Sequence, residues 1–218
     1  MNLYPSILEP SIEAAQHEIV WAAGFDQIRT LQIDIIDGQF VDNVTITPSD
    51  LPAIDFDDLA CDLHLMTEEP LDYVFELIEH KESIPTRAVI AQIERMSSQS
   101  SFIETVKKNN WQVGLSLDLF SPLESIDEDS WRQLDIVQLM AIEAGFQGQD
   151  FNDHVYEKIT ELNHLEKLYG RDWEVIIDGG IKPKHVPLLS AAGVEGMVVG
   201  SGLWQADDLQ EAVSKYLL

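Results

Sequence analysis

Cysteine, basic side chains and long apolar runs are all scarce in this sequence of 218 residues. The single cysteine, Cys61, excludes an internal disulfide, and its apolar neighbours predict a small core side chain. No apolar run approaches the roughly 18 to 20 residues that a membrane-spanning helix needs. The N-terminus enters a predicted strand at Tyr4 without the charged and apolar regions of a signal peptide. We therefore expect a cytoplasmic protein with no membrane partner.

The shortage of basic residues gives the chain a formal charge of -26, because 39 acidic residues face only 13 Lys and Arg. Binding to nucleic acid or to an anionic membrane depends on clustered Lys and Arg, so the composition argues against both. An anionic ligand would also be repelled by the overall field. Its binding would have to depend on local donors, such as backbone amides at helix N-termini.

Hydrophobic residues make up 45% of the chain, which is enough for one substantial core. We therefore treat residues 1–218 as a single domain. Apolar runs and turn residues predict eight strands. These are 4–8, a strand around Asp34, 59–66, 87–93, 112–117, 136–140, 174–177 and 196–199. Helical patterns predict helices between them. These are 11–23, 70–78, 102–109, 123–131, 153–169, 183–192 and 206–217.

Each strand is followed by a helix or by a connection of helical length, which is typical of a parallel sheet. At this length the expected α/β fold is a closed (β/α)8 TIM barrel, whose usual size is about 250 residues and whose lower limit is about 200. An open, doubly wound sheet is the alternative. It is weakened because no GxGxxG motif follows the first strand.

The stretch from Leu31 to Asn43 places Asp34 and Asp37 among apolar residues. Asp34 lies within a run of β-branched residues typical of a strand that is covered on both faces. A buried carboxylate costs several kcal/mol unless a cation or hydrogen bonds compensate it, so Asp34 is a candidate catalytic or metal-binding acid. A satisfied structural carboxylate is the alternative. Asp37, next to Gly38, is expected to cap the turn.

Three polar residues occupy predicted strand ends: Asp34, His64 and Asp178. In a barrel these ends meet at one mouth, where the chemistry of such folds takes place. Two carboxylates and an imidazole suit a divalent cation, with zinc, manganese and iron all allowed. Taken singly, His64 could be a hydrogen-bonded core histidine and Asp178 could shape a turn.

Glycines follow the last two predicted strands, at Gly179-Gly180 and at Gly200-Ser201-Gly202. The loops at these places in such barrels commonly hold a phosphate group on backbone amides, and glycine lets the backbone approach it closely. Ordinary tight turns are the alternative. A phosphate held in this way needs no basic side chain, although Lys182 and Lys184 could assist at the adjacent helix start.

Together these motifs resemble those of the ribulose-phosphate 3-epimerase family, in the same order and over nearly the full length. The matching pieces are Pro5-Ser6-Ile7-Leu8, Asp34-Ile35-Ile36-Asp37-Gly38, Asp62-Leu63-His64-Leu65-Met66, Gly145-Phe146-Gln147-Gly148-Gln149, Ile177-Asp178-Gly179-Gly180-Ile181 and Gly200-Ser201. The resemblance implies a metal-binding isomerase of carbohydrate metabolism that acts on a sugar phosphate in the pentose phosphate series. It also implies a homo-oligomer.

In that family two histidines and two aspartates hold a divalent metal, and the aspartates move the proton at C3 of a ketose phosphate through an enediolate. The resemblance implies that Asp34 and Asp178 are these acids, and that they bind zinc, manganese, iron or cobalt together with His64. It further implies a set of substrate contacts. These are Ser6, His64, Met66, Met140, Gly145, Phe146, Gln147, Gly148, Gly179, Gly180, Gly200 and Ser201.

The sequence departs from the family pattern at Gln32, which stands two residues before Asp34 in place of a metal-binding histidine. Gln39 and Gln92 also replace histidines. An amide oxygen is a weaker, neutral ligand than imidazole, so with Gln32 as the fourth ligand the metal should bind more weakly, in an altered coordination, or not at all.

Three functions remain open at this stage. The first is epimerisation of D-ribulose 5-phosphate to D-xylulose 5-phosphate, which the acid pair and the glycine turns favour. The second is the same chemistry on allulose 6-phosphate, which the sequence does not distinguish. The third, favoured by Gln32, is a sugar-phosphate-binding or regulatory protein that has lost efficient catalysis.

Overall fold

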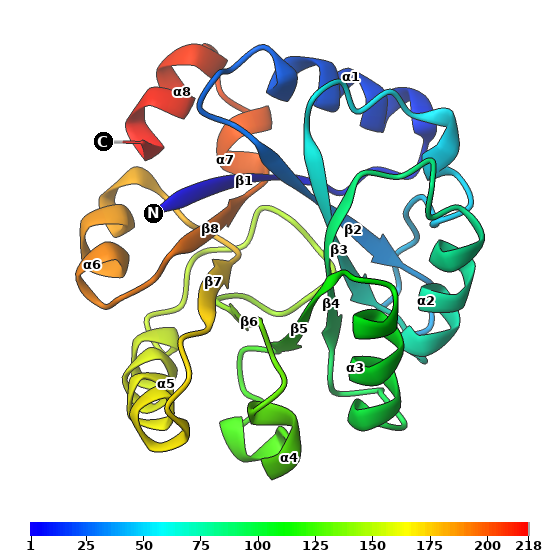
Figure 1. Ribbon diagram of the computed structural model, residues 1–218. Coiled ribbons are helices and arrows are strands. Elements are labelled where there is room, and N and C mark those ends of the chain that lie inside the picture. Colours follow the sequence, from blue (N-terminus) through cyan, green and yellow to red (C-terminus); the bar gives the residue numbers. More distant parts are fainter. Residues whose placement is uncertain (218) are drawn as a thin grey trace.

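Eight parallel strands close into a barrel in the computed structural model, which describes residues 1–217 (Figure 1). Each strand pairs with the next along the chain, and β8 pairs with β1. The strands are β1 (Asn2–Ile7), β2 (Thr30–Ile36), β3 (Ala60–Met66), β4 (Thr86–Gln92), β5 (Gln112–Leu117), β6 (Ile136–Met140), β7 (Glu174–Asp178) and β8 (Gly196–Val199). The predicted (β/α)8 TIM barrel is confirmed, and the open sheet is excluded.

Helices form a ring around the barrel (Figure 1). The α-helices are α1 (Ile12–Ala23), α2 (Pro70–Glu79), α3 (Gln99–Lys108), α4 (Glu128–Trp131), α5 (Val155–Tyr169), α6 (Val186–Ala191), α7 (Ser201–Trp204) and α8 (Leu209–Tyr216). Short 3-10 helices lie at η1 (Leu51–Ala53), η2 (Leu123–Ser125) and η3 (Pro183–His185). Among residues 1–217, every helix is too short or too polar to cross a lipid bilayer.

Three of the predicted helices are wrong in detail. The helix expected over residues 102–109 begins at Gln99, because the Ser98 side chain accepts from the Ser101 N–H and caps it there. The helix expected over residues 123–131 is divided into η2 and α4, because Ile126 is extended and the Asp127 backbone N–H donates to the Gln99 side chain at 2.9 Å. The closing helix begins at Leu209 rather than Ala206, because the Asp208 side chain accepts from the Glu211 N–H and caps it there. Residues 201–204 form a separate short helix, α7, which the sequence did not predict.

Inside the barrel, side chains of alternating character form successive layers from the N-terminal to the C-terminal ends of the strands. Strand β6 shows the order, because Ile136 lies in an apolar cluster, Gln138 is buried and polar, and Met140 lies in a second apolar cluster at the mouth. The first cluster comprises Tyr4, Ala88, Ile90, Ile136, Ile176 and Val198. The second comprises Ile36, Met66, Met140, Ile142 and Ala144. Asp34 and Asp178 lie in the polar layer between these two apolar clusters.

Below the first apolar cluster, charged residues close the N-terminal end of the barrel. The Arg87 guanidinium donates two hydrogen bonds to the Asp62 carboxylate and one, at 2.9 Å, to Glu174. The Tyr4 hydroxyl also donates to Glu174, and Arg87 lies 5.0 Å from the centre of the Tyr4 ring. A charge that is paired and hydrogen-bonded is tolerated in the interior. Asp62 and Glu174 can therefore close this end of the barrel, because both are paired with Arg87.

The main core lies between the barrel and its helices, where the outward-facing strand residues pack against the apolar helix faces. Cys61 is fully buried there, as predicted. The Asp37 carboxylate accepts from the backbone N–H groups of Gln39 and Phe40 and so caps the turn after β2, also as predicted. The site residues are therefore carried by strands that are packed on both faces.

The carboxyl group of Glu18, on α1, allows a test of how an acidic residue affects stability as the pH changes. Burial and the nearby charge of Glu9 raise the pKa of its carboxyl group from 4.5 to about 8. Between these values the unfolded chain loses the proton while the folded protein keeps it, so stability falls as the pH rises through this window. We expect Glu18→Gln to increase the melting temperature relative to wild type at pH 8.5 by about 2–4 °C, the shift that corresponds to about 1 kcal/mol at this chain length.

The gain from Glu18→Gln should shrink towards zero as the pH falls to 4.5. Thermal unfolding followed by circular dichroism at pH 4.5, 6.5 and 8.5 measures it, with the exposed Glu82→Gln as the control. An equal gain at all three pH values would contradict the prediction.

Candidate active site

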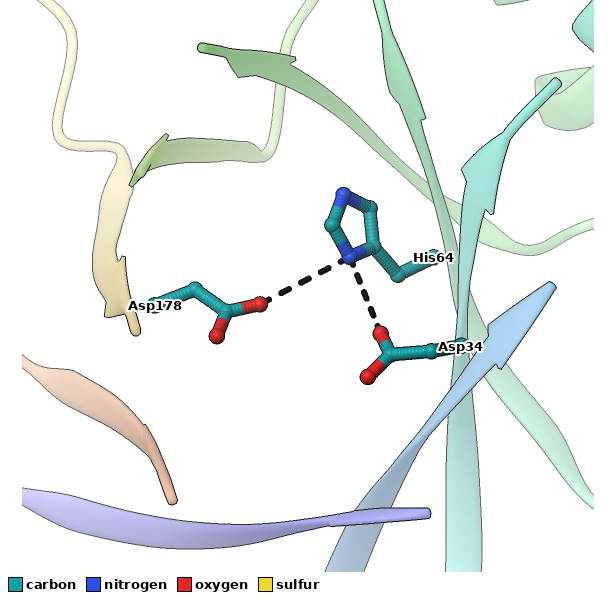
Figure 2. Close-up of side chains that lie close together, drawn as sticks. All are labelled: Asp34, His64 and Asp178. Atoms are coloured by element: carbon teal, nitrogen blue, oxygen red, sulfur yellow. Dashed lines mark hydrogen bonds and ion pairs between the residues drawn. The ribbon is translucent and has the colours of Figure 1, made fainter. Parts of the chain in front are cut away.

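The three polar residues predicted to converge do so at the C-terminal ends of the strands (Figure 2). Asp34 in β2 is the register partner of His64 in β3, and Asp178 ends β7. Side chains of register partners on parallel strands point to the same face, which brings the first two together. One ligand atom from each of the three residues lies within 4.8 Å of the others, and all three residues are buried.

Asp34 is held by hydrogen bonds on both carboxylate oxygens. Oδ2 accepts from Ser6 Oγ at 2.6 Å, while Oδ1 accepts from Gln32 Nε2 at 2.8 Å and lies 3.0 Å from His64 Nδ1. Ser6 is itself fixed, because its carbonyl accepts from Trp204 Nε1 at 2.7 Å. These donors stabilise negative charge on Asp34 and fix its orientation.

Asp178 has a different environment. Its Oδ2 accepts from Gln32 Nε2 at 2.8 Å and from Gln138 Nε2 at 3.1 Å, whereas no side chain or backbone donor within residues 1–217 is found on Oδ1. Burial, and then the charge of Asp34, raise the pKa of Asp178 from 3.8 to about 7. One carboxyl group of the pair therefore retains a proton over part of the neutral range.

His64 lies beneath the pair and is fully buried. With its amide oxygen facing His64, Gln92 accepts from Nε2 at 3.2 Å and from Ser116 Oγ at 3.1 Å, and donates to Glu94 at 2.9 Å. Burial alone would lower the pKa of His64, but the hydrogen bond to Asp34 and its charge outweigh burial and raise it. The imidazole is thus oriented by Gln92 on one side and Asp34 on the other.

Gln32 occupies the point on which these groups converge. Its Nε2 atom lies 2.8 Å from an oxygen of each aspartate and 3.3 Å from His64 Nδ1. The two carboxylate oxygens and the imidazole nitrogen form a donor set that suits a divalent cation. An amide nitrogen offers no ligating electron pair, so Gln32 can complete the set only with its oxygen turned inward.

A cavity of about 250 Å³ opens above the pair. It is lined by all the predicted site residues except Gln32 and His64, which lie below it with 1% and 0% exposure. Met66 and Met140 form an apolar part of its wall, and Phe146 from the loop after β6 lies on its rim. A molecule in the cavity therefore contacts Asp34 and Asp178 directly.

The glycine turns after β7 and β8 border the same cavity. In residues 1–217, the backbone N–H groups of Gly180 and Gly200 are found to donate no hydrogen bond, which leaves them free for an anion. Lys182 also lines the cavity and its ammonium group pairs with Asp150 at 2.7 Å, whereas Lys184 is exposed and away from the lining.

The loop after β6 is packed onto these turns. Gln147 Nε2 lies 3.4 Å from Ser6 Oγ, and the same side chain lies against Gly200. The Gly145 carbonyl accepts from Asn43 Nδ2 at 2.9 Å, which ties the loop to the segment after β2. The loop after β6 therefore contacts Ser6 in β1, the turn after β8 and the segment after β2.

The sequence interpretation missed two residues of the site, Gln138 and Trp204. Gln138 is the single polar residue in the otherwise apolar strand β6, a signal comparable to that of Asp34 in β2. Gln92 was noted only as a departure from the family pattern. Trp204 has no such signal, because its contact with Ser6 joins residues 198 positions apart.

This geometry is that of a (β/α)8 barrel enzyme with a buried pair of carboxyl groups at the mouth. The sequence model of the Ribulose-phosphate 3 epimerase family matches residues 2–204. The chain belongs to this family and is an isomerase of the epimerase type that acts on carbohydrates.

Relatives with curated names agree with this assignment. A ribulose-phosphate 3-epimerase of Bacillus subtilis (strain 168) is 33% identical over 219 residues, covering 99% of this chain and 97% of its own. One of Chlamydia pneumoniae is 34% identical over 184 residues, covering 82% and 77%. A solved 3-hexulose-6-phosphate synthase superposes with a TM-score of 0.63 at 17% identity, covering 99% of this chain and 98% of its own, and shows the fold alone.

Substitution of Gly180 tests how tightly the chain at Phe151 packs on the turn after β7. Its φ is +65°, and an added Cβ would lie 2.5 Å from the Phe151 backbone nitrogen. We expect Gly180→Ala to reduce the free energy of unfolding by about 2–3 kcal/mol, the sum of backbone strain and a clash with atoms that cannot rotate away. Urea denaturation measures the loss.

Gly148→Ala is the matched control, because Gly148 also has a positive φ of +85° but has no neighbour within 4 Å of the added Cβ. It should lose only about 1 kcal/mol, the cost of the backbone conformation. Equal losses in the two variants would show that the contact with Phe151 is not tight.

Proposed function

We propose that the protein epimerises C3 of a ketose phosphate, interconverting D-ribulose 5-phosphate and D-xylulose 5-phosphate. The observation that carries this proposal is the buried Asp34–Asp178 pair at the base of a cavity whose rim offers free backbone N–H groups. Two carboxyl groups are what inversion at carbon requires, since one removes the proton and the other returns it to the opposite face. Membership of the family supports the same reaction.

In this mechanism the phosphate group binds the N–H groups of Gly180 and Gly200, near Ser201. That contact places C3 of the sugar between the two aspartates. One aspartate takes the C3 proton as the C3–H bond breaks, and the electron pair forms the enediolate with its charge on the C2 oxygen. The other aspartate then gives its proton to C3 from the far side. The pKa of Asp178, near 7, suits a group that must alternate between donor and acceptor.

Other residues control the surroundings of the reacting carbon. Ser6 holds Asp34 through the 2.6 Å hydrogen bond, and Met66 and Met140 exclude water from the apolar side. Exclusion of water strengthens the interactions of the developing negative charge with nearby donors. Phe146 and Gln147, on the loop after β6, cover the substrate.

Asp34, His64 and Asp178 would hold a divalent cation, with the Gln32 oxygen as a fourth ligand after its amide turns. When bound, such a cation supplies positive charge next to the C2 oxygen. Zinc, manganese, iron and cobalt all accept this donor set. The substitution of Gln32 for a histidine predicts weak binding.

The proposal also covers the domain organisation, location, oligomeric state and partners of the protein. We infer that residues 1–218 act as one domain, in the cytoplasm and as a homo-oligomer, without a nucleic-acid or membrane partner. Allulose 6-phosphate would undergo the same reaction at the same pair. Gln32 also favours a second function, in which the barrel binds a sugar phosphate and does not turn it over.

The direct test follows the conversion of ribulose 5-phosphate to xylulose 5-phosphate by the purified protein, with chelator and with added zinc, manganese, iron or cobalt. Allulose 6-phosphate is assayed in parallel. Turnover of ribulose 5-phosphate under any condition supports the proposal. Binding of ribulose 5-phosphate with no turnover under all conditions would replace it with the binding function.

Asp34→Asn tests the acid pair. An amide cannot accept the C3 proton, so exchange of that proton with deuterium from solvent should fall by about 10³-fold or more, within the range of general acid–base catalysis. Proton NMR of the sugar in D2O measures the exchange. The exposed Asp42→Asn is the matched control and should retain wild-type exchange. Exchange that persists in Asp34→Asn would remove Asp34 from the reaction.

A further inference from the structure

The amide nitrogen of Gln32 is the one side-chain group found within residues 1–217 to hydrogen-bond both aspartates, since His64 Nδ1 lies 3.0 Å from Asp34 Oδ1 but 3.6 Å from Asp178 Oδ2 (Figure 2). It donates one hydrogen bond to Asp34 Oδ1 and one to Asp178 Oδ2, both at 2.8 Å. A primary amide has two N–H groups, so both are used. Gln32 is therefore a bridge between the two carboxyl groups.

Such a bridge lowers the electrostatic cost of placing two carboxyl groups in one buried site. Two carboxyl groups that share a buried space repel each other when both are charged, and burial makes each charge costly. Either a cation or hydrogen-bond donors must offset this cost. The two N–H groups of Gln32 lie where they offset it on both residues at once.

Two further glutamines strengthen the arrangement. Gln138 donates a second hydrogen bond to the same oxygen of Asp178, at 3.1 Å, and Gln92 holds the far side of His64. Gln32, Gln92 and Gln138 come from β2, β4 and β6 and are all at most 1% exposed. Hydrogen bonds from buried polar side chains fix one arrangement of the groups that they contact.

We propose that Gln32 is a positioning residue that holds Asp34 and Asp178 together in place of a divalent cation, so that the acid pair is formed without metal. The proposal rests on the proposed function for the purpose of the pair, although the bridge itself does not depend on the substrate. For a cation to bind these three ligands, the Gln32 amide must turn and give up both hydrogen bonds. The bridge and the cation are therefore alternatives.

Calorimetric titration of the chelator-treated protein with Zn²⁺ tests this competition. Gln32→His replaces the bridge with a fourth nitrogen ligand, so it should bind one equivalent of zinc at least about 100-fold more tightly than wild type. Wild-type protein that binds one equivalent as tightly as Gln32→His would overturn the proposal.

Thermal unfolding in the presence of chelator and of zinc gives a second readout. Gln32→Leu removes the bridge, so it should melt at a lower temperature than wild type in chelator and should be stabilised by zinc, while wild type is not. Gln138→Leu is the matched control, since within residues 1–217 the Gln138 side chain is found to hydrogen-bond Asp178 and not Asp34. Its melting temperature should stay insensitive to zinc. If wild type and Gln32→Leu respond equally to zinc, the bridge has no such role.

Activity separates the failure of this proposal from that of the proposed function. Turnover of ribulose 5-phosphate by wild type that survives the chelator supports both. Turnover that strictly requires zinc overturns the proposed role of Gln32 and leaves the proposed epimerase function intact. With no turnover under any condition, the epimerase fails, and the zinc titration of wild type and Gln32→His still decides whether Gln32 replaces the cation.

Discussion

The juxtaposition of two carboxyl groups in one buried layer is the constraint on which the rest of this structure depends. Asp34 and Asp178 cannot both be charged at low cost in such a place, and the polar side chains that contact them supply hydrogen bonds. Ser6, Gln32 and Gln138 supply donors, and His64 Nδ1 lies 3.0 Å from Asp34 Oδ1. Apolar clusters below and above confine the layer, so the site owes its geometry to the packing of the whole barrel interior.

A second constraint is the sign of the protein's charge. With a formal charge of -26, the molecule repels an anionic substrate at a distance. The free N–H groups of Gly180 and Gly200 offer attraction that acts only at short range, because the field of a peptide dipole falls off steeply. Lys182 adds little, since Asp150 already pairs with its ammonium group. The proposed recognition of a phosphate would thus depend on its fit to the backbone.

Much of this architecture was predictable, because the alternation of strands and helices and the residues at strand ends are local signals. Parallel register places Asp34 beside His64, and closure of the barrel brings Asp178, at the end of β7, to the same mouth. The role of Gln32 was not predictable in the same way. Its side chain had been expected to offer an oxygen to a metal, whereas its nitrogen joins residues from β2 and β7, which meet only across the closed barrel. The division of residues 123–131 likewise depends on a contact with Gln99, which begins the neighbouring helix α3 and lies 28 positions earlier in the sequence.

The close approach of Gly180 to the backbone of Phe151 has a consequence for how such a protein can evolve. Because two stretches of main chain touch there with no side chain between them, neither can be rerouted unless the other moves as well. A new ligand preference would therefore be acquired most readily through exchange of the loop side chains that line the cavity, such as Phe146 and Gln147, while the path of the chain stays as it is. The backbone of the loop is thus constrained, whereas its side chains can be exchanged.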